Sequence, residues 1–291
     1  MIEKRIYVSG YWLVKSNIKK SQSVYMFGIE RTFRLLRNSQ LFFFTDCDTV
    51  KPLLYDLSKK FNIDLTVIHK PLQELPAKEF VDKIVDSAKS MNLSRSDINY
   101  DINPYSEKGI IHYFRDLKKA GEDNYRSLLL IWLSKILLVN ETISTYSSIN
   151  DRKLICWVDC TAEWFSHTRN NWNFSQQKLP LDKLSHYGGA LYYMGNRMPI
   201  VANFLSGGTD VWEKLENEFL NEVKLVENVA YAHDEETLLN NILIKNPENF
   251  NTIGTGYAVK TINSLESIVR NITKKYVYYR QRLDDLWFER N

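Results

Sequence analysis

One short run limits the folds open to this chain: Leu41-Phe-Phe-Phe-Thr45 is apolar at almost every position and is closed by Asp46-Cys-Asp48. A strand with one face in water alternates apolar and polar residues. A strand of a parallel sheet has helices on both faces and is apolar throughout. The run therefore predicts a buried strand of a parallel sheet in an α/β protein.

The segments around this run alternate between strand and helix. The spacing predicts strands over residues 5–10 and 64–69, and helices over residues 21–36 and 50–61. Strand, helix, strand, helix, strand is the opening half of a doubly wound α/β sheet.

The second half continues with the strongest helical pattern of the chain, residues 125–143, which is apolar over most of its circumference and is capped near Asn124. A buried strand over 153–158 follows and ends at Asp159. Further strands are expected over 187–201 and 203–205, and helices over 209–226 and 235–244. With no repeat and no low-complexity linker, we expect one domain over residues 1–291, built on a mixed, mainly parallel sheet flanked by helices.

Composition excludes several classes of protein. Apolar residues make up 44% and charged residues 25%, as in globular proteins, and 38 Lys and Arg against 35 Asp and Glu leave a net charge of only +3. A nucleic-acid partner is not expected at this charge. The most apolar stretch, 128–139, is too short to span a bilayer, and the N-terminus carries no hydrophobic secretion segment, so we expect a cytoplasmic protein.

Common site motifs are missing. The sequence has no G-x-G-x-x-G, no phosphate-binding P-loop, no G-x-S-x-G and no H-E-x-x-H. Ligands of open α/β sheets bind outside the carboxyl ends of the strands. That rule alone selects residues 10–13, Asp46, His69 and Asp159 as candidates.

Two acidic sites follow apolar strands. One is the D-x-D of Asp46 and Asp48, and the other is Asp159. A carboxylate at such a place can hold Mg²⁺ or Mn²⁺, which takes oxygen ligands and bridges a diphosphate. Trp132 and Lys135 share one face of the helix before Asp159, so the Lys135 ammonium either meets a phosphate or Asp159, or extends to solvent at the helix edge.

Ile131-Trp-Leu-Ser-Lys-Ile-Leu-Leu-Val139 and Cys156-Trp-Val-Asp159 resemble the central signature of the HtrL/YibB-like family of bacterial proteins. Further similar segments are Tyr7-Val-Ser-Gly-Tyr-Trp12, Phe43-Phe-Thr-Asp46 and His233-Asp-Glu-Glu236. The family looks like a branch of GT-A-type glycosyltransferases of surface-glycan assembly. The resemblance implies a GT-A-like fold, with a nucleotide-sugar-binding half over residues 1–160. An acceptor-side half with a C-terminal helical tail would occupy 161–291.

The resemblance also implies roles. Asp159 would be the metal and diphosphate carboxylate, and Asp46 would be a nucleoside contact or a plain cap at the end of its strand. The donor would be a nucleotide sugar, with a UDP-sugar favoured, and the acceptor a glycan or lipid-linked glycan of lipopolysaccharide or capsule type. Because Asp159-Cys-Thr161 lacks the second acid of a D-x-D, the Mg²⁺ or Mn²⁺ cofactor is an open expectation, and Lys135 or Arg169 is the alternative neutralising cation. The full set of expected donor-binding residues is Ser9, Gly10, Tyr11, Asp46, Trp132, Lys135, Asp159, Ser206, Gly207 and Gly208.

Two later blocks leave alternatives open. The Gly207–Gly208 pair lets a backbone approach a sugar closely, or is an ordinary turn into a helix capped by Thr209 or Asp210. Asp234, Glu235 and Glu236 begin a helix, where acids are favoured by the dipole; one of them is also the expected general base of an inverting transfer.

The tail over 274–288 interleaves cations and aromatic residues, typical of a closing amphipathic helix or of a peripheral contact with the inner membrane face. Two rivals to the transferase remain. One is a non-catalytic nucleotide- or glycan-binding protein with the same fold. The other is a different α/β transferase that uses Asp46 and Asp48 as its metal pair.

Overall fold

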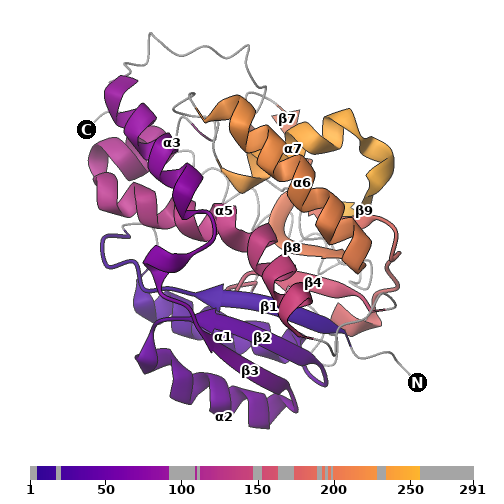
Figure 1. Ribbon diagram of the computed structural model, residues 1–291. Coiled ribbons are helices and arrows are strands. Elements are labelled where there is room, and N and C mark those ends of the chain that lie inside the picture. The colour runs from indigo at the N-terminus through magenta and orange to yellow at the C-terminus, as the bar shows by residue number, and fades with distance from the viewer. Residues whose placement is uncertain are drawn as a thin grey trace.

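The chain forms three layers, with a seven-stranded sheet between two sets of helices (Figure 1). The computed structural model describes residues 5–17, 21–91, 109, 112–146, 153–162, 174–188, 192–193, 196–197, 199–227 and 234–255. The mixed, mainly parallel α/β fold expected from the sequence is confirmed.

The sheet has the strand order β3-β2-β1-β4-β8-β5-β9. Its strands are β1 (Ile6–Tyr11), β2 (Gln40–Thr45), β3 (Asp64–His69), β4 (Ile155–Val158), β5 (Leu184–Gly188), β8 (Val201–Gly207) and β9 (Phe250–Thr255). Four neighbouring pairs are parallel, and the two pairs that include β8 are antiparallel. A separate hairpin joins β6 (Tyr192–Tyr193) to β7 (Asn196–Arg197).

Six α-helices cover this sheet among the described residues: α1 (Gln22–Leu35), α2 (Lys51–Phe61), α3 (Lys78–Met91), α5 (Glu122–Thr145), α6 (Thr209–Val226) and α7 (Glu235–Lys245). Short 3-10 turns are η1 (Asp48–Val50), η2 (Leu72–Glu74), η7 (Phe174–Gln176) and η8 (Pro247–Asn249), and η5 (Tyr113–Lys119) is a π-helix.

Alternation along the strands separates two cores, because successive side chains of a strand point to opposite faces. Ile6 and Val8 of β1 join the core under α3, α5, α6 and α7, whereas Tyr7 and Tyr11 join the core under α1 and α2. Figure 1 shows α1 and α2 on one side of the sheet and the other four helices opposite them. The continuous apolar run of β2 follows from this double cover.

The structure differs from the sequence prediction at three elements. The long helix begins at Glu122 rather than near Asn124, whose buried side chain instead donates to the carbonyl of Asp116. Strand β9 was not expected, since Phe250-Asn-Thr-Ile-Gly-Thr255 carries little apolar signal. The strands expected over 187–201 and 203–205 are β5 and β8 with different bounds.

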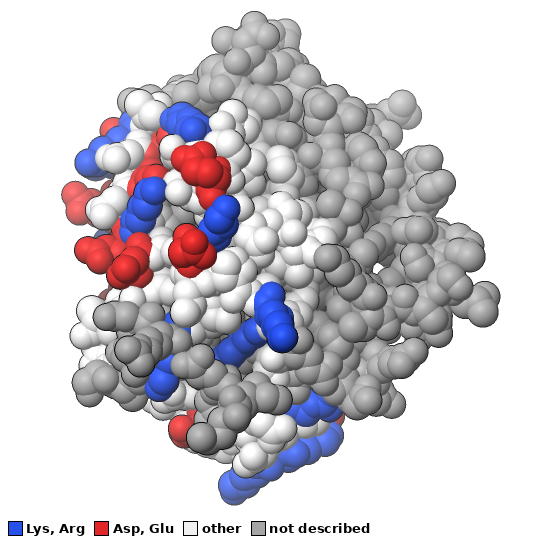
Figure 2. Space-filling model, turned by 90° about the vertical axis from the view of Figure 1, so that its right-hand side faces the viewer, with Lys and Arg blue, Asp and Glu red and all other residues white. Residues whose placement is uncertain are grey.

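Helix α5 is long and apolar enough to cross a membrane by length and composition, but 61% of its most apolar window is buried inside the fold. It contacts α3, α6, β1 and β4, as the core helix of a folded domain does. On the face drawn in Figure 2, acidic and basic side chains of the described residues intermingle at the upper left, and mainly basic ones lie below them.

Candidate functional site

The switch in strand order lies between β1 and β4. From β1 the chain runs outward through β2 and β3, and it then returns to place β4 on the other side of β1, parallel to it. Ligands of open α/β sheets bind outside the carboxyl ends of the strands at this point. Tyr11 ends β1, and Asp159 directly follows β4 at the same edge.

A buried ammonium joins two carboxylates at this edge. The Lys135 Nζ lies 2.9 Å from Oδ1 of Asp159 and 2.8 Å from Oε1 of Glu235, to which it donates a hydrogen bond. The side chains of Lys135 and Glu235 are 5% and 8% exposed, whereas that of Asp159 is 31% exposed. The expectation that Lys135 reaches Asp159 is confirmed, and Asp159 is the member of this cluster open to solvent.

Three elements bring the cluster together. Lys135 lies on α5, Asp159 follows β4, and Glu235 is the first residue of α7. Asp159 follows β4 two residues after Trp157, so the two side chains point to the same side of the sheet, toward α5. The Trp157 indole Nε1 donates to Asp159 Oδ1 at 2.8 Å, and the Lys135 ammonium lies 6.0 Å from the Trp157 ring.

The neighbouring carboxylates stabilise the charged form of Lys135. Burial alone would lower the pKa of this ammonium, but the adjacent carboxylates of Asp159 and Glu235 raise it above its ordinary value. Lys135 is therefore positive at neutral pH and forms an ion pair with each of the two carboxylates.

A second buried network, which sequence reasoning missed, adjoins the first. His112 Nδ1 lies 2.8 Å from Asp116 Oδ2, and the Arg115 guanidinium donates to both oxygens of the same carboxylate. The other imidazole nitrogen of His112 is 3.9 Å from Asp234 Oδ2, and its ring lies 4.6 Å from that of Trp132. The spacing of His112, Arg115 and Asp116 at i, i+3 and i+4 is the signal that could have found this network.

Burial decides the protonation of one member of this network, and hydrogen bonds decide that of another. Burial lowers the pKa of His112, although the hydrogen bond to Asp116 opposes it, so this imidazole is neutral. Burial would raise the pKa of Asp116, but the hydrogen bonds from His112 and Arg115 prevail and hold it well below its usual range. Trp132, an expected donor contact, lies against this network and is partly exposed.

Each of the three acids expected to supply a general base has a partner within the fold. Asp234 caps α7 by accepting from the backbone N–H of Thr237 at 2.9 Å. Glu236 accepts from the backbone N–H of Ala202 at 3.0 Å, and Glu235 pairs with Lys135. Asp234 therefore has the structural role at the start of the helix that the sequence left open. Glu235 is the acid whose carboxylate belongs to the Asp159 cluster.

The expected donor residues on β1 are buried. Ser9 and Tyr11 are 1% and 2% exposed, and their hydroxyls make no hydrogen bond within the described part of the chain. A Cβ on Gly10 would lie 2.5 Å from the Trp12 ring, so glycine is needed here for the packing of Trp12. These residues line the switch point from inside the protein.

The D-x-D after β2 does not form a paired site. Asp46 Oδ2 accepts from the backbone N–H of Leu72 at 2.9 Å, which ties the end of β2 to η2. The Asp48 side chain is 85% exposed and forms an ion pair with Lys51. Asp46 therefore serves as the strand-end contact that the sequence left as an alternative, and the metal-pair rival loses its support.

The structure does not bring Ser206, Gly207 and Gly208 together with Asp159. Because β8 runs antiparallel to β4, Gly207 pairs with Ile155 at the start of β4. Four residues of strand, about 13 Å, separate that level from Asp159. Ser206 is fully buried and accepts from the thiol of Cys156, and Gly208 caps α6, where a Cβ would lie 2.7 Å from the carbonyl oxygen of Leu181.

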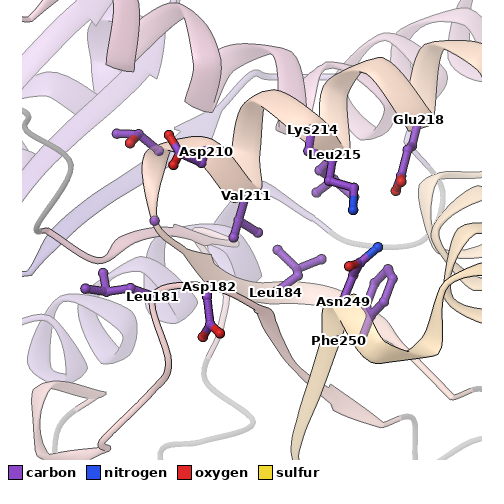
Figure 3. A pocket seen from close by; sticks show the side chains of 12 residues that line it. Leu181, Asp182, Leu184, Asp210, Val211, Lys214, Leu215, Glu218, Asn249 and Phe250 are labelled. Carbon is purple, nitrogen blue, oxygen red and sulfur yellow. The ribbon is translucent and has the colours of Figure 1, made fainter.

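Gly208 instead adjoins a pocket of about 310 Å³ at the opposite edge of the sheet. Figure 3 shows it between the start of α6 and the first residues of β5 and β9. Its lining includes Leu181, Asp182, Asp210, Lys214, Asn249 and Phe250. Only Gly208 among the expected site residues reaches it.

The residues present do not fit a divalent cation. Asp159 Oδ1 already accepts from Trp157 and faces the Lys135 ammonium, and a positive charge at 2.9 Å repels a second cation. Within the described residues, no group of three His, Cys, Asp or Glu side chains could hold a metal ion. Arg169 and the 274–288 tail lie outside the described residues.

Comparisons with known proteins add little. No family model matches the chain, and no curated protein matches it. A solved structure named "Structure of Transferase" aligns with 83% of this chain and 84% of its own, at 10% identity and a TM-score of 0.39. A likeness this distant says nothing of activity. Membership of the HtrL/YibB-like family stays a prediction.

Proposed function

We propose that this chain is a glycosyltransferase that moves a sugar from a nucleotide-diphosphate sugar, with a UDP-sugar favoured, to a surface-glycan acceptor of lipopolysaccharide or capsule type. The observation that carries the proposal is the Lys135–Asp159–Glu235 cluster, which lies at the carboxyl end of β4 beside the switch in strand order. Ligands of open α/β sheets bind there.

The sheet supports the same proposal. Three parallel strands lie in the order β3-β2-β1, β4 is added next to β1, and β8 is the reversed strand beside it. This strand order supports the GT-A-like sheet that the sequence resemblance implies. In this interpretation the donor lies at the carboxyl ends of β1 and β4, in the half expected over residues 1–160.

The chemistry of the cluster suits a sugar. An ionised carboxylate only accepts hydrogen bonds, and the part of Asp159 that is open to solvent can accept from a ribose or sugar hydroxyl. The N-terminus of α7, which begins at Glu235, carries a partial positive charge that favours nearby phosphate oxygens. Of the expected acids, Glu235 is the best-placed general base, since Asp234 and Glu236 satisfy backbone N–H groups.

A non-catalytic nucleotide- or glycan-binding protein is the second candidate. Asp234, Glu235 and Glu236 each already have a partner within the fold, which favours this candidate. A carboxylate that is paired with an ammonium or accepts from a backbone N–H is a weak proton acceptor. Either protein would be cytoplasmic, with the tail over 274–288 as the proposed contact with the inner membrane face.

Ligand-dependent thermal unfolding with UDP-sugars tests the proposal. A ligand at 100 times its Kd stabilises the native state by about 2.7 kcal/mol, so a genuine donor raises the Tm by several degrees. We expect this shift in the wild type and in Asp48→Asn, an exposed control, and its loss in Asp159→Asn. A shift retained in Asp159→Asn, or absent from the wild type with every nucleotide sugar, would refute the site.

Release of free UDP separates the two candidates. The transferase should release UDP when an acceptor is added, and Asp159→Asn should lower kcat/KM by about 10²–10³, on the scale of other charge-stabilising groups. Binding without any UDP release, at every acceptor tried, would favour the non-catalytic protein.

A further inference from the structure

The Lys135 ammonium occupies the position from which a metal ion would bridge two carboxylates. Its Nζ contacts Asp159 Oδ1 at 2.9 Å and Glu235 Oε1 at 2.8 Å, and these oxygens come from different elements, the end of β4 and the start of α7. A divalent cation prefers such carboxylate oxygens as ligands. The two acids converge on one point, and a fixed charge of the chain already lies there.

Removal of this charge would leave two carboxylates facing one another. Glu235 is almost fully buried, and the Trp157 indole fixes the Asp159 carboxylate against rotation. Both carboxylates lie within 2.9 Å of the Lys135 Nζ, and two negative charges this close to one point repel each other strongly at low dielectric. The site therefore needs one cation at this point, and Lys135 supplies it.

We infer that Lys135 replaces a divalent cation at this site, so that the protein binds its ligand without a resident metal, and that removing the ammonium creates a metal site between Asp159 and Glu235. The first statement deepens the proposed function, because it concerns the donor of that same site. The second concerns this chain alone and holds whether or not the ligand is a nucleotide sugar.

Binding of Mn²⁺ alone tests the inference, followed by the loss of the EPR signal of aqueous Mn²⁺. We expect the wild type to show no Asp159-dependent binding tighter than about 1 mM, the weak end of protein sites for divalent cations. Lys135→Ala should gain binding at least tenfold tighter, and Lys135→Ala/Asp159→Asn should lose it. Lys70→Ala is the matched control: Lys70 is partly buried, and its only ion pair among the described residues is with Glu141, so this variant should gain nothing.

Two results would overturn the inference. One is submillimolar Mn²⁺ binding in the wild type that Asp159→Asn removes. The other is a folded Lys135→Ala variant that gains no Mn²⁺ affinity. If Lys135→Ala is unfolded without metal, recovery of its far-UV CD spectrum in millimolar Mn²⁺ supports the inference, and no recovery counts against it.

A second experiment measures the shift of Tm that UDP-glucose produces in the wild type, once in the presence of EDTA and once in the presence of Mn²⁺. Equal shifts of Tm in both conditions are expected. A shift that needs Mn²⁺ would overturn the inference and leave the proposed function standing. No shift in either condition would count against the proposed function, and the measurement with Mn²⁺ alone would still decide the inference.

Discussion

Replacement of Lys135 by methionine tests the energetics of the cluster most directly. Methionine keeps the length and apolar stem of the side chain but removes the ammonium from between Asp159 and Glu235. At an effective dielectric of about 20, the charges 2.8 Å apart attract by about 6 kcal/mol before desolvation is counted. Because the loss of one partner leaves a buried charge unpaired, we expect Lys135→Met to lower the free energy of unfolding by about 3–5 kcal/mol.

A double-mutant cycle separates the ion pair from the packing. Glu235→Gln alone should cost less, about 1–2 kcal/mol, since Asp159 still pairs with Lys135. Lys135→Met/Glu235→Gln has no unpaired Glu235 charge, so it should be more stable than the sum of the single losses predicts, by about 2 kcal/mol.

Urea denaturation followed by far-UV CD measures all four proteins, with Tm as a second measure that changes by roughly 2 °C per kcal/mol at this chain length. A loss under about 1 kcal/mol in Lys135→Met would refute the reasoning. So would single effects that add within about 0.5 kcal/mol, because the charges would then not interact in the native state.

Two further predictions concern stability away from the cluster. Burial lowers the pKa of His186 from 6.5 to about 4, so the unfolded chain takes up a proton that the folded chain does not, and stability falls as the pH drops from about 6.5 to 4. The wild type should lose about 3 kcal/mol from this group over that window, and His186→Gln should show a flatter Tm profile between pH 7 and 4.5; equal profiles would contradict the assignment. Gly208→Ala should cost about 2 kcal/mol because its Cβ would lie 2.7 Å from the rigid carbonyl of Leu181, and Gly207→Ala should cost less because its Cβ meets the side chain of Val211. Thermal unfolding compares the two alanine variants, and the reverse order would show that the Leu181 backbone moves freely.

Much of the fold could be predicted because its signals are local. The apolar run of β2 reflects cover on both faces, and the helix over residues 209–226 has the same bounds in α6 as in its sequence pattern. Asp159 and Lys135 could be singled out for the same reason: one follows an apolar strand, and the other is a charge on an apolar helix.

Strand direction was not available from the sequence. Side chains alternate with a period of two whichever way a strand runs, so nothing in Val201–Gly207 indicates that β8 is reversed. The reversal carries Ser206, Gly207 and Gly208 to the edge opposite Asp159. The sequence placed them in the donor site because a glycine pair lets a backbone approach a sugar closely.

The sequence by itself determined the layers, most elements and the residue types at the carboxyl ends of the strands, because hydrophobic period and turn residues act over a few positions. Only the tertiary structure decided which charges meet. Lys135 and Glu235 are 100 residues apart, and Asp159 meets them because β4 lies under α5 while α7 begins at the same edge. Long-range contacts of this kind follow from the packing of whole elements, which no local pattern encodes.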